Sequence, residues 1–214
     1  MSPAGAPSAP STPRPTPTAV TAGAPADTAG SRPPRRRHTA RWIALSVLLV
    51  AGALVAVLAT RPPATATEVD SPLVGQRAPA LAGTTLDGGT FSLSSLAGRW
   101  VFVNFFASWC PPCQQEQADL VAFAYHHRAP GDAALVGVAF DDAASSARAF
   151  LAQSGATWPA LADPGGARAL QYGVRGPPET FLVSPQGIVV AHFDGPVTSG
   201  FLDYWLGRAR STAA

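Results

Sequence analysis

The two cysteines of the chain stand in one short segment that directly follows an apolar run. The segment is Trp109-Cys110-Pro111-Pro112-Cys113, and the run before it covers residues 101–106. The run predicts a strand, and the residues after the cysteines are compatible with a helix. A cysteine pair at a helix N-terminus closes a small, readily reversed disulfide, and the helix dipole favours its thiolate. We therefore expect thiol chemistry at Cys110 and Cys113.

The same cysteine pair has two other interpretations. A zinc site needs four ligands, and the chain holds no further cysteine. His126 and His127 are immediate neighbours, and a helix from Cys113 to His126 would carry them about 20 Å from the thiols. This arrangement disfavours zinc. A purely structural disulfide usually closes a longer loop, because loop entropy gives it most of its value.

The N-terminal third of the chain predicts a membrane anchor. Residues 1–41 are rich in proline, alanine, serine and threonine, which predicts a disordered leader. Residues 42–60 carry no charge and come close to the ~20 residues that span a bilayer, so we expect a transmembrane helix. The positive charges gather before this helix, which places the leader in the cytoplasm and exports the rest. The arginines before it are Arg32, Arg35, Arg36, Arg37 and Arg41, and the next ones are Arg61 and Arg77.

Two kinds of export signal compete with an uncleaved anchor. Ala64-Thr65-Ala66 resembles a signal-peptide cleavage site, but the apolar part of a signal peptide is usually about 7 to 15 residues long. Arg35-Arg36 lacks the apolar pair that normally follows a twin-arginine signal. We expect an anchor at 42–60, a linker at 61–71 and a domain at 72–210. The net charge of +2 reflects the basic leader and does not support nucleic-acid binding.

The exported part alternates strand and helix patterns. The continuously apolar runs 101–106 and 136–140 predict parallel strands covered on both faces. Asp87-Gly88-Gly89 predicts the turn of a leading β-hairpin, and 184–187 predicts the turn of a second one. The expected elements are a hairpin at 81–93, strands at 101–106, 136–140 and 158–161, helices at 143–154 and 167–172, a hairpin at 180–193 and a helix at 199–208.

Two segments resemble the thioredoxin superfamily, and more narrowly its TlpA/ResA/CcmG (DsbE) branch. They are Val-Asn-Phe-Phe-Ala-Ser-Trp-Cys-Pro-Pro-Cys at 103–113 and Gly-Val-Arg-Gly-Pro-Pro-Glu-Thr-Phe-Leu-Val at 173–183. The resemblance covers about 72–208. It implies a thioredoxin-like α/β fold, with a central mixed β-sheet flanked by helices and an added N-terminal β-hairpin. It also implies a membrane-tethered extracytoplasmic reductant without a cofactor, and several such proteins keep the haem sites of apocytochromes c reduced.

The resemblance also assigns roles around the cysteines. Cys110 would be the exposed nucleophile and Cys113 the buried resolving thiol. Pro178 matches a cis-proline that faces the two cysteines and leaves the preceding backbone free for a substrate strand. Glu116 matches an acidic residue that tunes thiol protonation, although a solvated glutamate that complements the helix dipole is an equal alternative.

Other residues near the motifs have weaker assignments. Trp109 is expected beside the thiols at a docking surface, or else in ordinary core. Glu179 is interpreted either as a partner-selecting residue or as an exposed carboxylate at a strand start. Asn104 occupies the place of a buried aspartate in thioredoxins, which leaves proton handling to Glu116 or water. The histidines His126, His127 and His192 are expected on the surface.

Pro111 and Pro112 lead to an expectation about redox direction. Both fit the first turn of a helix, and both lack an N–H that would stabilise a Cys110 thiolate. We therefore expect a moderately acidic Cys110 and a reductant. An integral membrane electron donor would recharge it, and exported proteins with disulfides, including apocytochrome c, would be its substrates.

Three competing functions use the same fold. An oxidase would run the reaction in reverse, and the cysteine pair alone does not decide the direction. A copper chaperone would hold a soft ion between the thiolates, with His192 as the candidate extra ligand. A thiol peroxidase is set aside, because the Pro-Thr pattern before a single cysteine is absent around Cys110.

Overall fold

The computed structural model describes residues 37–59 and 65–213 and divides the chain into two compact units, 1–60 and 61–214. Most of the expected leader lies outside the described residues. The helices are α1 (Arg37–Ala59), α2 (Pro111–Arg128), α3 (Ala144–Ser154), α4 (Ala167–Tyr172) and α5 (Ser199–Ala213). The strands are β1 (Thr67–Glu68), β2 (Ala82–Thr84), β3 (Thr90–Ser92), β4 (Trp100–Phe106), β5 (Ala133–Phe140), β6 (Ala160–Asp163), β7 (Glu179–Val183) and β8 (Val189–Asp194).

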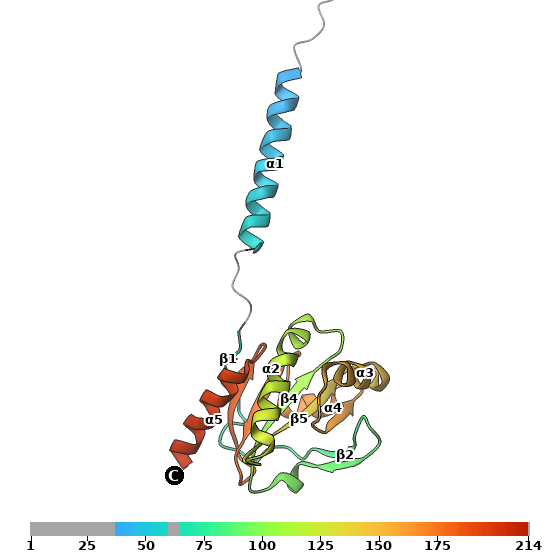
Figure 1. Ribbon diagram of the computed structural model, residues 1–214, viewed down its shortest axis with the longest axis vertical. Coiled ribbons are helices and arrows are strands. Elements are labelled where there is room, and N and C mark those ends of the chain that lie inside the picture. The colour runs from blue at the N-terminus through green and yellow to red at the C-terminus, as the bar shows by residue number, and fades with distance from the viewer. Residues whose placement is uncertain (1–36, 60–64, 214) are drawn as a thin grey trace, which may run out of the picture. The chain divides into compact units, whose positions relative to one another are not determined.

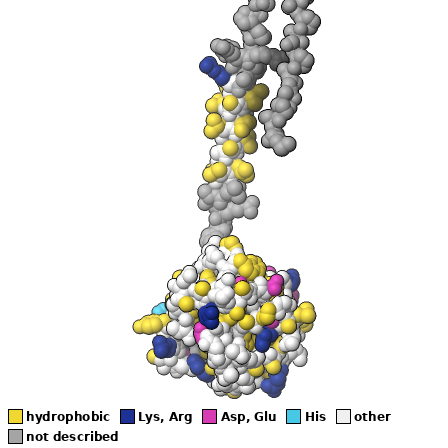
Figure 2. Space-filling model, turned by 90° about the vertical axis from the view of Figure 1, so that its right-hand side faces the viewer, with side chains coloured by type: hydrophobic (Ala, Val, Ile, Leu, Met, Phe, Trp, Pro, Cys, Tyr) yellow, Lys and Arg dark blue, Asp and Glu magenta, His cyan; other side chains and the backbone are white. Residues whose placement is uncertain are grey.

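The first unit is described by α1 alone. This helix includes almost all of the expected span 42–60, whose last residue lies outside the described residues. The large apolar side chains of α1 are exposed, and Figure 2 shows hydrophobic side chains along the face of this helix that is turned to the viewer. Judged by length and hydropathy together, none of the helices within the described residues qualifies as a membrane span.

The second unit is built on a mixed six-stranded sheet with the order β1-β8-β7-β4-β5-β6 (Figure 1). The central strand β4 runs parallel to β5 and antiparallel to β7. Every residue of β4 is buried, as its apolar run 101–106 predicts for a strand covered on both faces. The leading hairpin forms as expected, but β2 and β3 make a separate two-stranded sheet. The expected thioredoxin-like α/β architecture is thus present.

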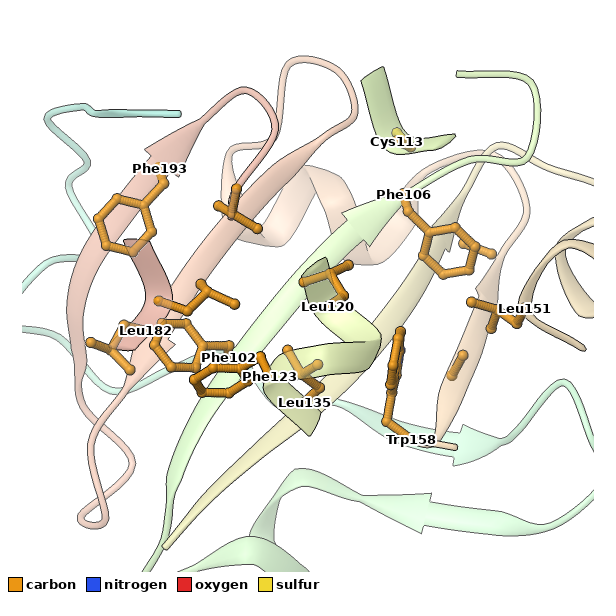
Figure 3. Close-up of a cluster of buried hydrophobic side chains, with 14 of the residues drawn as sticks. Phe102, Phe106, Cys113, Leu120, Phe123, Leu135, Leu151, Trp158, Leu182 and Phe193 are labelled. Atoms are coloured by element: carbon orange, nitrogen blue, oxygen red, sulfur yellow. The ribbon is translucent and has the colours of Figure 1, made fainter. Parts of the chain in front are cut away.

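Alternate residues of β4 feed two hydrophobic cores. Phe102 and Phe106 face a core that contains Leu120 and Phe123 of α2, together with side chains of α3 and α5. Figure 3 shows this core, with Cys113 at one end of it. Phe102 and Phe123 meet edge to face with ring centroids 5.2 Å apart. The opposite face of the sheet packs against α4 and the segment that leads into β2.

Some boundaries differ from the sequence expectation. β1 lies inside the expected linker 61–71 and pairs with the edge strand β8. A polar strand of two residues has no hydrophobic periodicity, so sequence reasoning does not detect it. β6 begins at Ala160 rather than 158, and α5 continues past 208 to Ala213. α4 ends as expected, because Gly173 adopts the left-handed conformation with φ of 71°.

Candidate active site

The cysteine pair forms a disulfide at the N-terminus of α2. The Cα atoms of Cys110 and Cys113 lie 5.3 Å apart. Cys110 is the N-cap residue, and Pro111 and Pro112 occupy the first two helical positions. The Cys113 backbone N–H donates to the Cys110 sulfur over 3.2 Å. In the first turn, therefore, a single backbone donor reaches the sulfur that would attack a substrate.

Both cysteines are buried in this disulfide form. Cys110 is only 2% exposed and Cys113 is fully buried, so the expectation of an exposed Cys110 is wrong for the oxidised state. The segment before β7 lies against the Cys110 sulfur. Its Pro177–Pro178 peptide bond is cis, as the resemblance implied, and the Pro177 carbonyl oxygen lies 3.4 Å from the Cys110 sulfur. The structure thus brings Cys110, Cys113 and Pro178 together.

Glu116 lies one helical turn after Cys113 and is buried. Its carboxylate accepts hydrogen bonds from Asn104 Nδ2 and from the Val197 backbone N–H, both over 2.9 Å. Burial raises the pKa of Glu116 to about 7, although these two hydrogen bonds act in the opposite direction. The alternative of a solvated glutamate is therefore wrong. A carboxyl group with this pKa is partly protonated near neutral pH.

Asn104 connects Glu116 to the sheet. Its Nδ2 also donates to Thr180 Oγ1 over 3.1 Å, across the β4–β7 pair. Both N–H groups of the buried Asn104 amide therefore donate hydrogen bonds, one to Glu116 and one to Thr180. This contact ties the carboxylate of Glu116 to the strand that follows the cis peptide bond.

Glu179 and His192 form a buried pair on the other face of the sheet. His192 Nε2 and Glu179 Oε2 lie 2.7 Å apart, and both side chains are almost completely buried. The expectations of an exposed Glu179 and a surface His192 are wrong, because the two side chains are buried and pair with each other through His192 Nε2. Glu179 Oε1 also accepts the backbone N–H groups of Arg175 and Gly176 over 2.7 and 3.1 Å. Burial alone would raise the pKa of Glu179, but these hydrogen bonds lower it.

Trp109 lies at the surface beside the disulfide, where it is 55% exposed, so the alternative of an ordinary core residue is wrong. Its Nε1 lies 3.4 Å from the Asp141 carbonyl oxygen. The Ser108 backbone N–H donates to Asp142 Oδ2 over 2.7 Å. Sequence reasoning missed this aspartate pair. Its signal was present, since both residues follow a buried parallel strand whose carboxyl end adjoins the one before the cysteines.

The other two histidines lie far along α2. His126 is exposed, as expected. His127 is not a surface residue, because its ring lies 2.8 Å from both Asp132 and Asp203 and is half-buried. Over the described residues, histidine, cysteine and acidic side chains form no group of three that would hold a metal ion.

A protein-family model, that of the AhpC/TSA family, matches residues 74–192. The chain belongs to the AhpC/TSA family. The thiol:disulfide interchange protein HelX of Rhodobacter capsulatus is 36% identical over 129 residues, which cover 59% of this chain and 70% of HelX. The thiol-disulfide oxidoreductase ResA of Bacillus thuringiensis subsp. konkukian is 27% identical over 135 residues, or 63% of this chain and 78% of ResA.

Solved structures agree with this AhpC/TSA assignment. A DsbE-type thiol:disulfide interchange protein of Chlorobium tepidum is 33% identical, has a TM-score of 0.53 and aligns over 57% of this chain and 85% of its own. A second thioredoxin-family protein of Chlorobium tepidum TLS is 29% identical, has a TM-score of 0.57 and aligns over 66% of this chain and 99% of its own. The fold and the disulfide at the start of α2 identify a thiol-disulfide oxidoreductase.

Proposed function

We propose that the protein is a membrane-tethered, extracytoplasmic reductase that acts on disulfides of exported proteins through Cys110 and Cys113. The observation that carries this proposal is the disulfide at the N-terminus of α2, which lies beside the cis Pro177–Pro178 bond. Relatives named DsbE, HelX and ResA support thiol-disulfide exchange as the reaction, without its direction. Apocytochrome c is a proposed substrate, because several proteins of the TlpA/ResA/CcmG branch, which this chain resembles, keep the cysteine pairs of apocytochrome c reduced.

The reaction balances as two exchange steps. The Cys110 thiolate attacks one sulfur of the substrate disulfide, a mixed disulfide forms, and the other substrate sulfur leaves as a thiolate. The Cys113 thiolate then attacks the Cys110 sulfur and releases the second substrate thiolate. Two electrons pass to the substrate, and the two protons of the Cys110–Cys113 dithiol end on the two substrate thiols. Glu116 is the nearby group that can accept and return a proton during the second step.

The surroundings of Cys110 support the direction of electron flow. Pro111 and Pro112 remove two N–H donors from the first turn of α2, and only the Cys113 N–H reaches the sulfur. A thiolate with few donors is weakly stabilised, and a weakly stabilised thiolate favours the disulfide form of the protein. A protein whose disulfide form is favoured gives electrons to its partner. We therefore propose a reductase, with an integral membrane electron donor to recharge it.

The membrane tether is proposed from the sequence. Residues 42–60 hold no charged residue, and five arginines lie between residues 32 and 41. α1 covers residues 42–59 of this run as a helix, and its large apolar side chains are exposed. A helix that is apolar on all sides suits a bilayer better than water.

One experiment tests the reductase directly. Full-length protein in detergent micelles is reduced and mixed with an oxidised peptide that contains Cys-X-X-Cys-His. We expect alkylation to show free peptide thiols and a newly formed Cys110–Cys113 disulfide. A Cys113→Ser variant should accumulate the mixed disulfide, and the matched Cys110→Ser variant should form none.

The reverse experiment separates the reductase from the oxidase. The oxidised protein is mixed with the reduced peptide under the same conditions. If the peptide becomes oxidised here while the reduced protein leaves the peptide disulfide intact, the proposed direction is wrong. A reductase leaves most of the reduced peptide unchanged.

A further inference from the structure

The loop 175–178 contacts the Cys110 sulfur through its Pro177 carbonyl, and its backbone N–H groups are not available to a partner. The Arg175 and Gly176 N–H groups both donate to Glu179 Oε1. Pro177 and Pro178 have no N–H. Within this described loop, therefore, a substrate strand finds backbone acceptors but no backbone donor.

One of those acceptors lies against the reacting sulfur. The Pro178 carbonyl accepts the Gly195 N–H over 3.0 Å. Among the described residues, the Pro177 carbonyl oxygen contacts only the Cys110 sulfur, which carries no hydrogen in a disulfide. The Pro177 residue is half-buried. In the disulfide form its carbonyl thus receives no hydrogen bond from the described residues and lies 3.4 Å from the reacting sulfur.

His192 holds the carboxylate that shapes this loop. It reaches Glu179 diagonally across the β7–β8 pair, and its ring stacks on Phe181 with centroids 4.1 Å apart and planes 6° from parallel. Its Nδ1 is buried and has no hydrogen-bond partner among the described residues. A neutral ring with its proton on Nε2 leaves only a lone pair unpaired at Nδ1, whereas a charged ring would bury an unpaired donor. We therefore assign the Nε2–H as the donor to Glu179.

We propose that His192 is a positioning residue for substrate docking, which holds Glu179 against the Arg175 and Gly176 amides and so fixes the Pro177 carbonyl as the acceptor for a substrate N–H beside Cys110. The inference rests on the proposed exchange reaction at Cys110. It predicts that substrates must present a backbone N–H next to the cysteine under attack. It also gives the two buried carboxylates different tasks, because Glu116 lies on the α2 face of the sheet and Glu179 on the opposite face.

The test compares two substitutions at one position. A glutamine amide nitrogen lies where His192 Nε2 lies, whereas the shorter asparagine does not reach Glu179. Reduced full-length protein is mixed with increasing amounts of the oxidised Cys-X-X-Cys-His peptide. For His192→Asn we expect the half-saturating peptide concentration to rise about tenfold, in line with the loss of one hydrogen bond to a charged group, and the limiting rate to change less than about twofold. His192→Gln should restore most of the affinity.

2-Hydroxyethyl disulfide serves as the control substrate, because it has no amide N–H to donate to the Pro177 carbonyl. Its reaction rate should be the same in wild type and in both variants. A peptide with an N-methyl group next to its cysteine should bind wild type about tenfold more weakly than the unmodified peptide does. His192→Asn should weaken the binding of this N-methyl peptide little further, because both changes break the same contact.

Several results would overturn the proposal. Equal losses with peptide and 2-hydroxyethyl disulfide would show a general effect on folding or on Cys110. An unchanged peptide affinity in His192→Asn, or full additivity with the N-methyl group, would show that His192 does not act through the Pro177 carbonyl. If wild type oxidises the peptide instead, the same comparison is made in that direction, so the docking proposal is judged separately from the reductase.

Discussion

The chemistry of Cys110 depends on which backbone donors surround its sulfur. Pro111 and Pro112 fill the first two positions of α2, and the Cys113 N–H is the donor that reaches the sulfur. A helix N-terminus normally stabilises a thiolate through several N–H groups. The two prolines therefore weaken the stabilisation that the N-terminus of α2 gives to the Cys110 thiolate.

The first prediction concerns the acidity of Cys110. Pro112→Ala restores one N–H to the first turn, so the pKa of the Cys110 thiol should fall and the variant should become a weaker reductant. The measurement is ultraviolet thiolate absorbance against pH in the reduced full-length protein, with Cys113→Ser as background. A wild-type Cys110 that already titrates near pH 4, about as DsbA does, would contradict the role given to the prolines.

The second prediction concerns Glu116, whose pKa is raised from 4.5 to about 7. Between these pH values the folded state binds more protons than the unfolded state, so stability falls as pH rises and levels off above about 7. The loss should be about 3 kcal/mol in the oxidised protein. Urea unfolding from pH 4 to 8 measures it.

Glu116→Gln removes the titrating group and should abolish most of this slope. Glu68→Gln is the matched control, because Glu68 is exposed in β1 and should leave the slope unchanged. A slope that persists in Glu116→Gln would assign the pH dependence to another group.

Among the strands, some are predictable from their apolar runs, and others form only because they pair with a neighbouring strand. The runs 101–106 and 136–140 predicted β4 and β5 because a strand buried on both faces needs apolar residues throughout. β1 was not predicted, because its pairing with β8 depends on backbone hydrogen bonds and not on its side chains. Local sequence patterns therefore predict the central strands of the sheet better than its edge strands.

The site shows the same division. Cys110 and Cys113 were predicted from their spacing, and the cis bond before Pro178 from resemblance. The buried pair of Glu179 and His192 was missed, because a single polar residue in a strand gives no sign of its partner. The expected second hairpin held the necessary signal. Its register places residues 179 and 192 diagonally on one face, where a carboxylate and an imidazole can meet.

The third prediction concerns the contact between α2, β5 and α5. His127 lies between Asp132 and Asp203, and Arg210 also pairs with Asp132. Burial alone would raise the pKa of Asp132, but its hydrogen bonds with His127 and Arg210 lower it from 3.8 to about 2. The ionised carboxylate thus stabilises the fold above about pH 4, and this contribution is lost as pH falls through about 2.

Thermal unfolding between pH 2 and 5 tests this contact. Asp132→Asn should lower the melting temperature at pH 5 and have little effect on it near pH 2. The loss in the free energy of unfolding at pH 5 should stay below about 1 kcal/mol, because the carboxylate is partly exposed. Asp87→Asn, at the exposed turn of the leading hairpin, is the control. An equal effect of Asp132→Asn at both pH values would show that its charge is not involved.

For the whole molecule, we propose a reducing centre and a membrane anchor in one chain. The fourth prediction is that the catalytic domain is exported and the N-terminus stays inside, because five arginines precede the apolar run 42–60. A fusion of alkaline phosphatase to the C-terminus should be active, and the membrane fraction should hold the full-length chain. Replacing these arginines with glutamine should reduce the exported fraction. An inactive fusion, or a protein released into the medium at a shorter length, would contradict the uncleaved anchor.

The reduction potential of the Cys110–Cys113 pair tests the central claim most directly. Full-length protein in detergent micelles is equilibrated with thiol-disulfide buffers of graded potential, and alkylation reports the reduced fraction of the two cysteines. The account predicts a potential near or below that of thioredoxin, about −270 mV, because few donors stabilise the Cys110 thiolate. A potential near that of DsbA, about −120 mV, would make the protein an oxidase of exported proteins and contradict the account.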